Sequence, residues 1–213
     1  LAEVLRRGAK RLLDIDPAEL VVGLYPTSQG SMTVFMADAL DNGAGYAVEL
    51  GQETNFLTLL DNTRASLSTE WESASHFRCT SACVDCLRSY DNRKLHGALD
   101  WRLALDMLDL LAGEGLALQR WHELGTQVAD GIAATGLLKL RSGHTENGST
   151  FILHEETRKA VLLGHPLWRQ DCDVDERSLA IRNVREQLDV HEVTCSDVFD
   201  ASRRPLAVIR MLV

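Results

Sequence analysis

Three cysteines within eight positions carry the clearest chemical signal in this sequence. Cys79, Cys83 and Cys86 form the spacing C-x3-C-x2-C, and His76 stands three positions before the first of them. Structural zinc sites use four tetrahedral nitrogen or sulfur ligands, and three thiolates on one tight turn supply most of that shell. The spacing therefore predicts a structural zinc site on these three cysteines.

The sequence leaves the fourth ligand open. His76 is nearest and is the favoured candidate, whereas His96 lies ten residues beyond Cys86 and could fold back, and a more distant residue is a third option. A redox pair at Cys83 and Cys86 is the competing hypothesis, but the third cysteine and the absence of a preceding βαβ pattern argue against it.

Composition and charge restrict the class of protein. The 213 residues, 45% of them hydrophobic, suffice for two small domains with cores of their own. No apolar stretch is long enough to cross a bilayer, and no leader with a cleavage site is present, so we expect a cytoplasmic location.

Net charge argues against a surface that binds phosphate throughout, since it is −9 for the whole sequence. Residues 76–102 nevertheless contain five basic and three acidic residues, a local charge of +2 that leaves −11 for the rest. Contact with DNA is therefore expected only in this segment, with Arg88, Arg93 and Lys94 as candidates; a solvated helix face is the alternative.

Periodicity predicts an N-terminal domain, residues 1–115, that is mostly helical and includes a short hairpin. The expected helices cover residues 2–13, 53–68 and 99–111, and the expected hairpin strands cover residues 20–25 and 32–37. The cysteines fall between the last two helices. These elements must therefore position the zinc site.

A smaller C-terminal α+β domain, residues 116–213, is predicted to hold an antiparallel-type sheet with flanking helices. The order is a helix, three strands, a helix and two strands, at residues 119–134, 137–140, 150–153, 159–163, 176–188, 190–193 and 206–212. This order invites comparison with restriction-endonuclease-like nucleases, whose Mg²⁺ site needs clustered carboxylates.

The comparison predicts at best a degenerate nuclease. Glu155, Glu156 and Lys159 fall in an expected turn, and the Glu-x-Lys pattern is missing. A metal-dependent nuclease in this domain stays the alternative function. A protein-docking module that uses the acidic surface and the loop around Trp168 is a further one.

The run CTSACVDCLRSYDNRKLHGALDWR, from Cys79 to Arg102, preceded by DALDNGAGY, from Asp38 to Tyr46, resembles the MrfA-like zinc-binding (MZB) domain. The resemblance covers about residues 1–112. That family occurs at the C-terminus of superfamily 2 DNA helicases in bacterial repair and in the DrmB-type subunit of the DISARM phage-defence system.

The resemblance implies a non-catalytic zinc module that packs against helicase motor domains and helps to guide DNA, with the three cysteines as ligands. It gives Asn92, His96 and Asp100 as motif positions of undefined role. The sequence departs from the family pattern where Asn42 replaces a glycine, and where three cysteines stand in place of four. No Gly-rich loop ending in Gly-Lys-Ser/Thr is present, so ATP binding is expected in a larger parent helicase instead.

Overall fold

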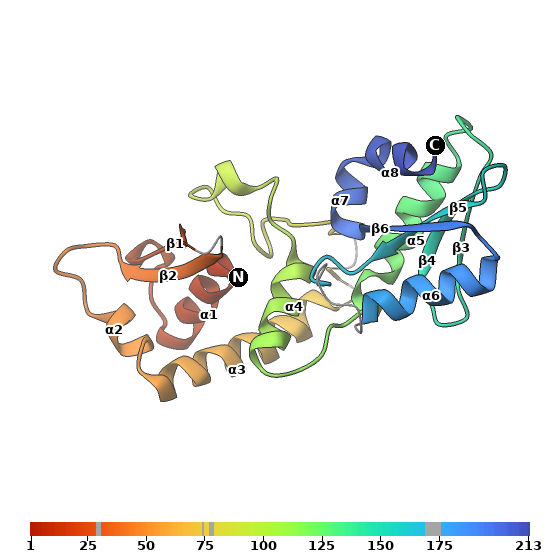
Figure 1. The fold of residues 1–213 in the computed structure, drawn as a ribbon. Helices are drawn as coiled ribbons and strands as arrows, with labels where there is room; N and C mark the ends of the chain where they lie inside the picture. Colours follow the sequence, from red (N-terminus) through yellow and green to blue (C-terminus); the bar gives the residue numbers. More distant parts are fainter. Residues whose placement is uncertain (29–30, 74, 77–78, 169–175) are drawn as a thin grey trace. The chain divides into compact units, whose positions relative to one another are not determined.

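A computed structural model describes residues 1–28, 31–73, 75–76, 79–168 and 176–213 of the chain (Figure 1). The chain forms two compact units, Leu1–Gly115 and Leu116–Val213. Both combine helices with a sheet, so the predicted α+β class is confirmed. Within the described ranges, every helix is too short or too polar to cross a membrane.

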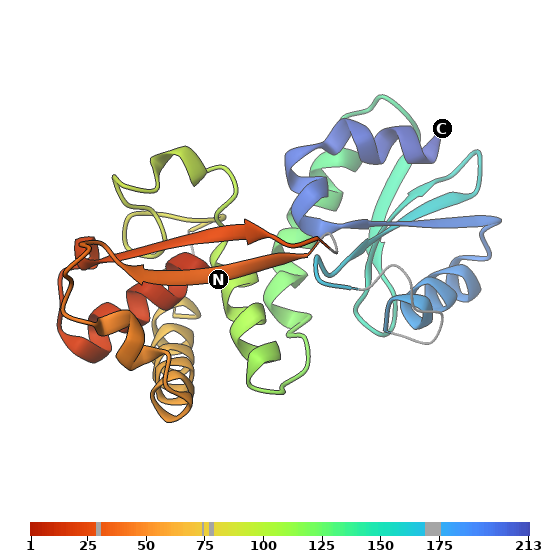
Figure 2. The ribbon, with the colours of Figure 1, turned by 60° about the vertical axis from the view of Figure 1, so that its left-hand side comes forward.

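Unit 1 is built from helices and one antiparallel hairpin. Its elements are α1 (Ala2–Leu13), η1 (Pro17–Glu19), β1 (Leu20–Pro26), β2 (Met32–Asp38), α2 (Tyr46–Leu50), α3 (Glu53–Trp71), η2 (Arg93–Leu95) and α4 (Trp101–Leu111). The predicted hairpin and all three predicted helices of this region are confirmed. The hairpin crosses over α1, as Figure 2 shows.

The core of unit 1 lies where α1, α3 and α4 meet the cysteine segment. Val4, Leu67, Leu105 and the cysteine Cys86 are all buried in one cluster. The strongly periodic sequence of α4 gives it an apolar face for this contact, and the Asp100 carboxylate caps its N-terminus by accepting from the amides of Arg102 and Leu103. The cysteine segment is thus part of the core.

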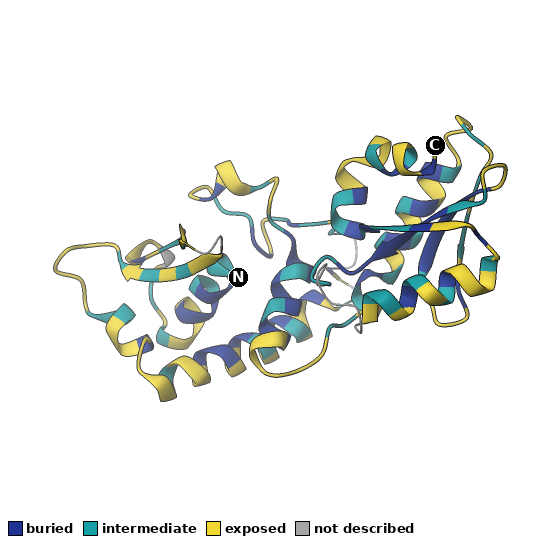
Figure 3. Ribbon diagram, in the orientation of Figure 1, coloured by how far each residue is buried: buried dark blue, intermediate teal, exposed yellow. Residues whose placement is uncertain are grey.

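Unit 2 is a four-stranded sheet with the order β3-β4-β5-β6. Helix α6 packs on β5 and β6, while α5 packs on β3 and β4 and also contacts α7 and α8. Both central strands are buried over nearly their whole length, which Figure 3 shows in dark blue. The elements are α5 (Gln119–Ala133), β3 (Leu140–His144), β4 (Thr150–His154), β5 (Lys159–Gly164), α6 (Glu176–Leu188), β6 (Glu192–Asp197), α7 (Val198–Arg203) and α8 (Pro205–Leu212).

The predicted last strand, residues 206–212, is wrong: this segment is helix α8. A short apolar run does not distinguish a strand from a buried helix, whereas Pro205 suits a first helical turn because its φ is fixed and its missing N–H is not needed there. Val208 and Leu212, four residues apart, are both buried and form the face of α8 that is turned toward the sheet of unit 2.

Two further features of the sheet differ from expectation. The first strand was predicted at residues 137–140, but it runs over Leu140–His144. It pairs with β4 from Leu140↔His154 to His144↔Thr150. The strand includes polar residues because it lies at the edge of the sheet. The sheet is also mixed, since β6 runs parallel to β5 after the crossover through α6.

Gly8 provides a test of the α1–α3 contact. A Cβ built on Gly8 would overlap Thr63 Oγ1 and lie 2.9 Å from Thr63 Cβ, with both residues buried. We expect Gly8→Ala to lower the free energy of unfolding by about 1–3 kcal/mol, because the overlap outweighs the better helix propensity of alanine. Urea unfolding followed by circular dichroism measures the change.

The matched control is Gly131→Ala in α5, where a Cβ meets no atom within 4 Å. This substitution is expected to raise stability by up to about 1 kcal/mol. Equal effects of the two substitutions would contradict close packing at Gly8.

Candidate metal centre

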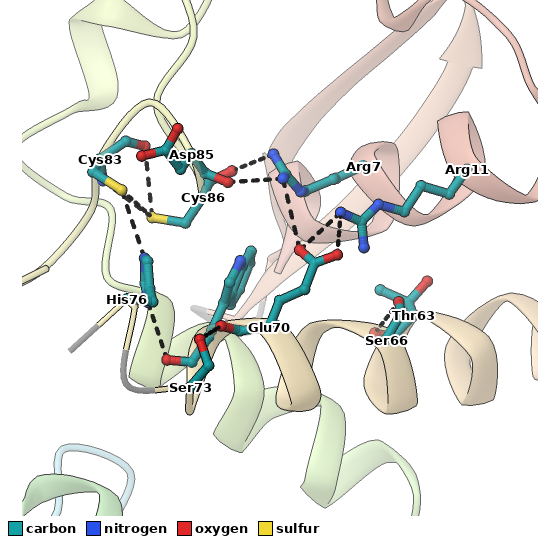
Figure 4. Close-up of polar contacts among 11 residues, drawn as sticks. Arg7, Arg11, Thr63, Ser66, Glu70, Ser73, His76, Cys83, Asp85 and Cys86 are labelled. Atoms are coloured by element: carbon teal, nitrogen blue, oxygen red, sulfur yellow. Dashed lines mark hydrogen bonds and ion pairs between the residues drawn. The ribbon is translucent and has the colours of Figure 1, made fainter.

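Four side chains of unit 1 bring their donor atoms together. His76, Cys79, Cys83 and Cys86 offer one nitrogen and three sulfurs that all lie within 4.8 Å of one another. Sγ of Cys86 is 3.9 Å from Sγ of Cys79 and 3.7 Å from Sγ of Cys83, and Nε2 of His76 is 3.6 Å from Sγ of Cys83. Figure 4 shows His76, Cys83 and Cys86 converging.

These distances fit the edges of a zinc tetrahedron. With zinc–sulfur bonds of about 2.3 Å and zinc–nitrogen bonds of about 2.0–2.1 Å, two sulfurs are separated by about 3.8 Å, and sulfur and nitrogen by about 3.5 Å. The donor set, three thiols and one imidazole, is also the one that structural zinc prefers. The residues present therefore fit a tetrahedral zinc site.

Tight turns present the cysteines to one point. The amide of Cys79 donates to the carbonyl of His76, and the amides of Cys86 and Arg88 both donate to the carbonyl of Cys83. The amide of Cys83 in turn donates to Sγ of Cys86 at 3.0 Å. An N–H that points at sulfur stabilises the thiolate form, which is the form that binds metal.

His76 is oriented for ligation through its second ring nitrogen. Nδ1 lies 3.0 Å from the carbonyl oxygen of Trp71, so it carries the proton and donates. This leaves the lone pair of Nε2 facing Cys83, an arrangement in which an outer hydrogen bond fixes the tautomer of a metal-binding histidine. The rings of Trp71 and Trp101 pack against the imidazole, with centroids 6.3 and 5.3 Å away.

His96 lies apart from this cluster. Its Nε2 is 2.9 Å from the carbonyl oxygen of Ser89 and 3.0 Å from Oδ1 of Asn92. The buried Asn92 also donates to the carbonyl of Leu87 and accepts from the amide of Ser89. Of the two histidines considered from sequence, the structure brings His76 to the cysteines and uses His96 in the loop that follows them.

The start of α4 holds the cysteine segment from the other side. The indole Nε1 of Trp101 donates to the carbonyl of Cys79, and Nη1 of Arg102 donates to the carbonyl of Thr80. Arg102, counted in the basic segment by sequence, is buried and is therefore no part of an exposed basic surface. Arg78, counted there too, lies outside the described residues.

Arg7 is a contributor that sequence reasoning missed. From α1, its guanidinium donates to the carbonyls of Cys86 and Asp85 at 2.8 and 2.7 Å, and it approaches Glu70, which pairs with Arg11 (Figure 4). Burial lowers the pKa of Arg7, but an arginine remains charged at neutral pH. A zinc ion with three thiolates has net charge −1, so this cation compensates it.

Two segments considered from sequence, the turn after β4 and the loop around Trp168, lie outside this cluster. Glu155 and Glu156 are exposed in the turn after β4, and Glu156 pairs with Lys139 at 2.8 Å. Trp168 packs against the core of unit 2, and its Nε1 donates to Glu176. In the part of the chain that the structure describes, no other group of three or more His, Cys, Asp or Glu side chains has metal-site geometry.

The geometry defines a structural zinc site of the knuckle type, made of three cysteines and one histidine. We call the segment from Cys79 to Cys86 the knuckle. Residues 1–87 match the family model described as the MrfA Zn-binding domain. The resemblance is thus confirmed, and the match ends one residue after Cys86, earlier than the residue 112 expected from sequence. A search of the curated proteins and a search of the solved structures gave no significant match.

Single substitutions test which side chains hold the metal. We expect about one zinc per chain, and a content well below one in Cys83→Ser and Cys86→Ser, because each loses a thiolate of the tetrahedron. His76→Cys is expected to keep zinc, since a fourth thiolate replaces the imidazole. Elemental analysis of purified chains is the measurement.

Cys195→Ser, which changes a cysteine of unit 2, is the control and should keep full zinc. Full zinc content in Cys83→Ser would refute the assignment.

Acid is expected to weaken zinc binding. Burial, and then the neighbouring Cys86, raises the pKa of Cys79, and burial also raises that of Cys86, so both are neutral thiols at neutral pH without metal. Zinc must displace these protons, and apparent affinity should rise about tenfold per pH unit for each one. Chelator competition between about pH 6.5 and 7.5 tests this; a flat profile would contradict it.

Proposed function

We propose that this chain is a non-catalytic, zinc-binding structural module of a larger DNA helicase or of a helicase-associated repair or phage-defence protein in the cytoplasm. The observation that carries the proposal is the match of residues 1–87 to the MrfA Zn-binding domain, together with the donor set at its end. The match supports the module. The helicase context comes from the resemblance.

The bound zinc would cross-link His76, Cys79, Cys83 and Cys86. Around it, this chain's own residues fix the position of three helices: Arg7 from α1, the Trp71 carbonyl from the end of α3, and Trp101 from the start of α4. The result is a rigid body suited to packing against motor domains. In this role the metal stabilises structure and performs no reaction.

DNA contact is part of the proposal through Arg88, Arg93 and Lys94. Arg93 and Lys94 are exposed on η2, and Arg88, two residues after the knuckle, is half-buried. Basic side chains on a loop beside a rigid zinc site suit phosphate contact, because the loop is held while the charges face solvent.

The nuclease alternative lacks support from the placement of the carboxylates. The αβββαβ order and the parallel β5–β6 pair are present in unit 2. Glu155 and Glu156, however, lie in an exposed turn, and Glu156 is paired with Lys139. A two-metal hydrolytic site requires several carboxylates at one point.

Removal of zinc is expected to lower the melting temperature of unit 1 and to leave the transition of unit 2 in place. The metal stabilises only the folded knuckle, and its loss also leaves Arg7 without the charge that it compensates. Differential scanning calorimetry with and without a chelator measures both transitions. An unchanged thermogram would refute a structural role for zinc.

DNA binding is the second test. We expect the chain to bind DNA with an affinity that falls as salt rises, and Arg93→Ala with Lys94→Ala to weaken it by about tenfold at low salt. Fluorescence anisotropy is the measurement, and the control is Lys139→Ala with Arg210→Ala, which removes the same charge from unit 2.

Plasmid DNA incubated with the chain and Mg²⁺ or Mn²⁺ should stay intact. Cleavage that is lost in Glu156→Gln would favour the nuclease instead.

A further inference from the structure

A cavity of about 120 Å³ lies between α1 and the residues that follow the knuckle. Three basic residues from consecutive turns of α1 line it, together with a basic residue and a hydroxyl from the knuckle side: Arg6, Arg7, Lys10, Arg88 and Ser89. Glu3 is the one acidic residue of the lining. Arg7 compensates the zinc centre to which Cys86 of the lining belongs, and Arg6 pairs with Glu3, so Lys10 and Arg88 supply the remaining positive charge that makes the cavity suitable for an anion.

Two donors at this cavity are unsatisfied. Nε of Arg7 and Nε of Arg88 are both buried, and neither has a hydrogen-bond partner among the residues that the structure describes. A buried guanidinium N–H without an acceptor is costly, so its occurrence needs an explanation. The two groups come from different elements, and both belong to residues that line this cavity.

The other basic side chains of the lining differ in whether their charge is already paired. Arg6 pairs with Glu3 at 2.8 Å and lies 3.5 Å from the Ser89 hydroxyl, so its charge is partly compensated. The Lys10 side chain is exposed and has no ion pair within the described ranges. Lys10 is therefore available to a ligand that enters from solvent.

We propose that this cavity binds a backbone phosphate of single-stranded DNA. Arg88, Lys10 and the Ser89 hydroxyl supply donors of the kinds that contact phosphate oxygens. The inference rests on the proposed DNA contact of the module and adds α1 to it, which places the strand along α1 and η2.

Tyr90 favours a nucleic acid over an acidic peptide. It follows Ser89 directly, its side chain is 79% exposed, and the Arg93 guanidinium lies 4.5 Å from its ring centroid. An exposed aromatic ring beside phosphate donors is the combination that stacks the bases of single strands. An acidic peptide would use the charges but not the ring.

The test measures binding of a fluorescein-labelled oligothymidylate of about 12 nucleotides to the zinc-loaded chain. Lys10→Ala and Arg88→Ala should each weaken binding roughly threefold to tenfold and make the salt slope shallower by about 0.7. Arg11→Ala is the matched control, because Arg11 lies on the same helix, pairs with Glu70 and does not line the cavity. Zinc content shows that each variant is folded.

The outcomes separate this inference from the proposed function. Normal affinity in both Lys10→Ala and Arg88→Ala, with weakened binding only in Arg93→Ala and Lys94→Ala, would refute the cavity and keep the DNA contact. No binding by the parent chain would refute both. Loss of oligonucleotide affinity in Tyr90→Ala supports the inference.

Two further binding measurements identify the kind of anion that the cavity accepts. Labelled polyglutamate that binds as tightly as the oligonucleotide, with the same dependence on Lys10, would assign the cavity to an acidic protein. Inorganic phosphate that binds while the oligonucleotide does not would assign it to a free anion. Either result overturns the proposal.

Discussion

A zinc ion with three thiolates carries one net negative charge, and in this protein that charge belongs beside an apolar core. Cys86 is 3% exposed and shares its cluster with Val4, Leu67 and Leu105. Burying an uncompensated charge is costly, so the fold must supply positive charge and N–H donors at this place. The Arg7 guanidinium and the amide of Cys83 do so, and these requirements tie α1 to the knuckle.

The same constraint explains how the surrounding loop is organised. Carbonyl oxygens of the knuckle accept hydrogen bonds from side chains of other elements: Arg7 from α1, and Trp101 and Arg102 from α4. The loop after the knuckle is held by Asn92 and His96. A segment with little regular secondary structure thereby has these backbone carbonyl groups satisfied, which permits it to lie against the core.

Much of unit 1 could be predicted because its information is local. Cysteine spacing indicated the metal, and periodicity indicated α1, α3 and α4. The choice between His76 and His96 depends on the Trp71 carbonyl and the Asn92 side chain, which hydrogen-bond the two imidazoles differently. The role of Arg7 depends on a contact that spans 79 residues. Spacing carries no information about either.

The errors in unit 2 have a related cause. The segment of α8 is apolar except for Arg210, so its pattern does not distinguish helix from strand, and packing decides. Strand β3 contains Arg141, Ser142 and His144, and it exists because β4 offers a partner edge. Composition alone describes such an edge strand as a turn.

The short sequence span of the ligands has a consequence for the order of folding. His76 and Cys86 are close in the chain, whereas the guanidinium of Arg7 reaches the carbonyl of Cys86 across 79 residues. Closing a short loop costs less chain entropy than closing a long one, so contacts within the knuckle form at an earlier stage than the docking of α1. We therefore expect metal capture to precede assembly of the helical body, with the captured ion as the template on which α1 finally docks.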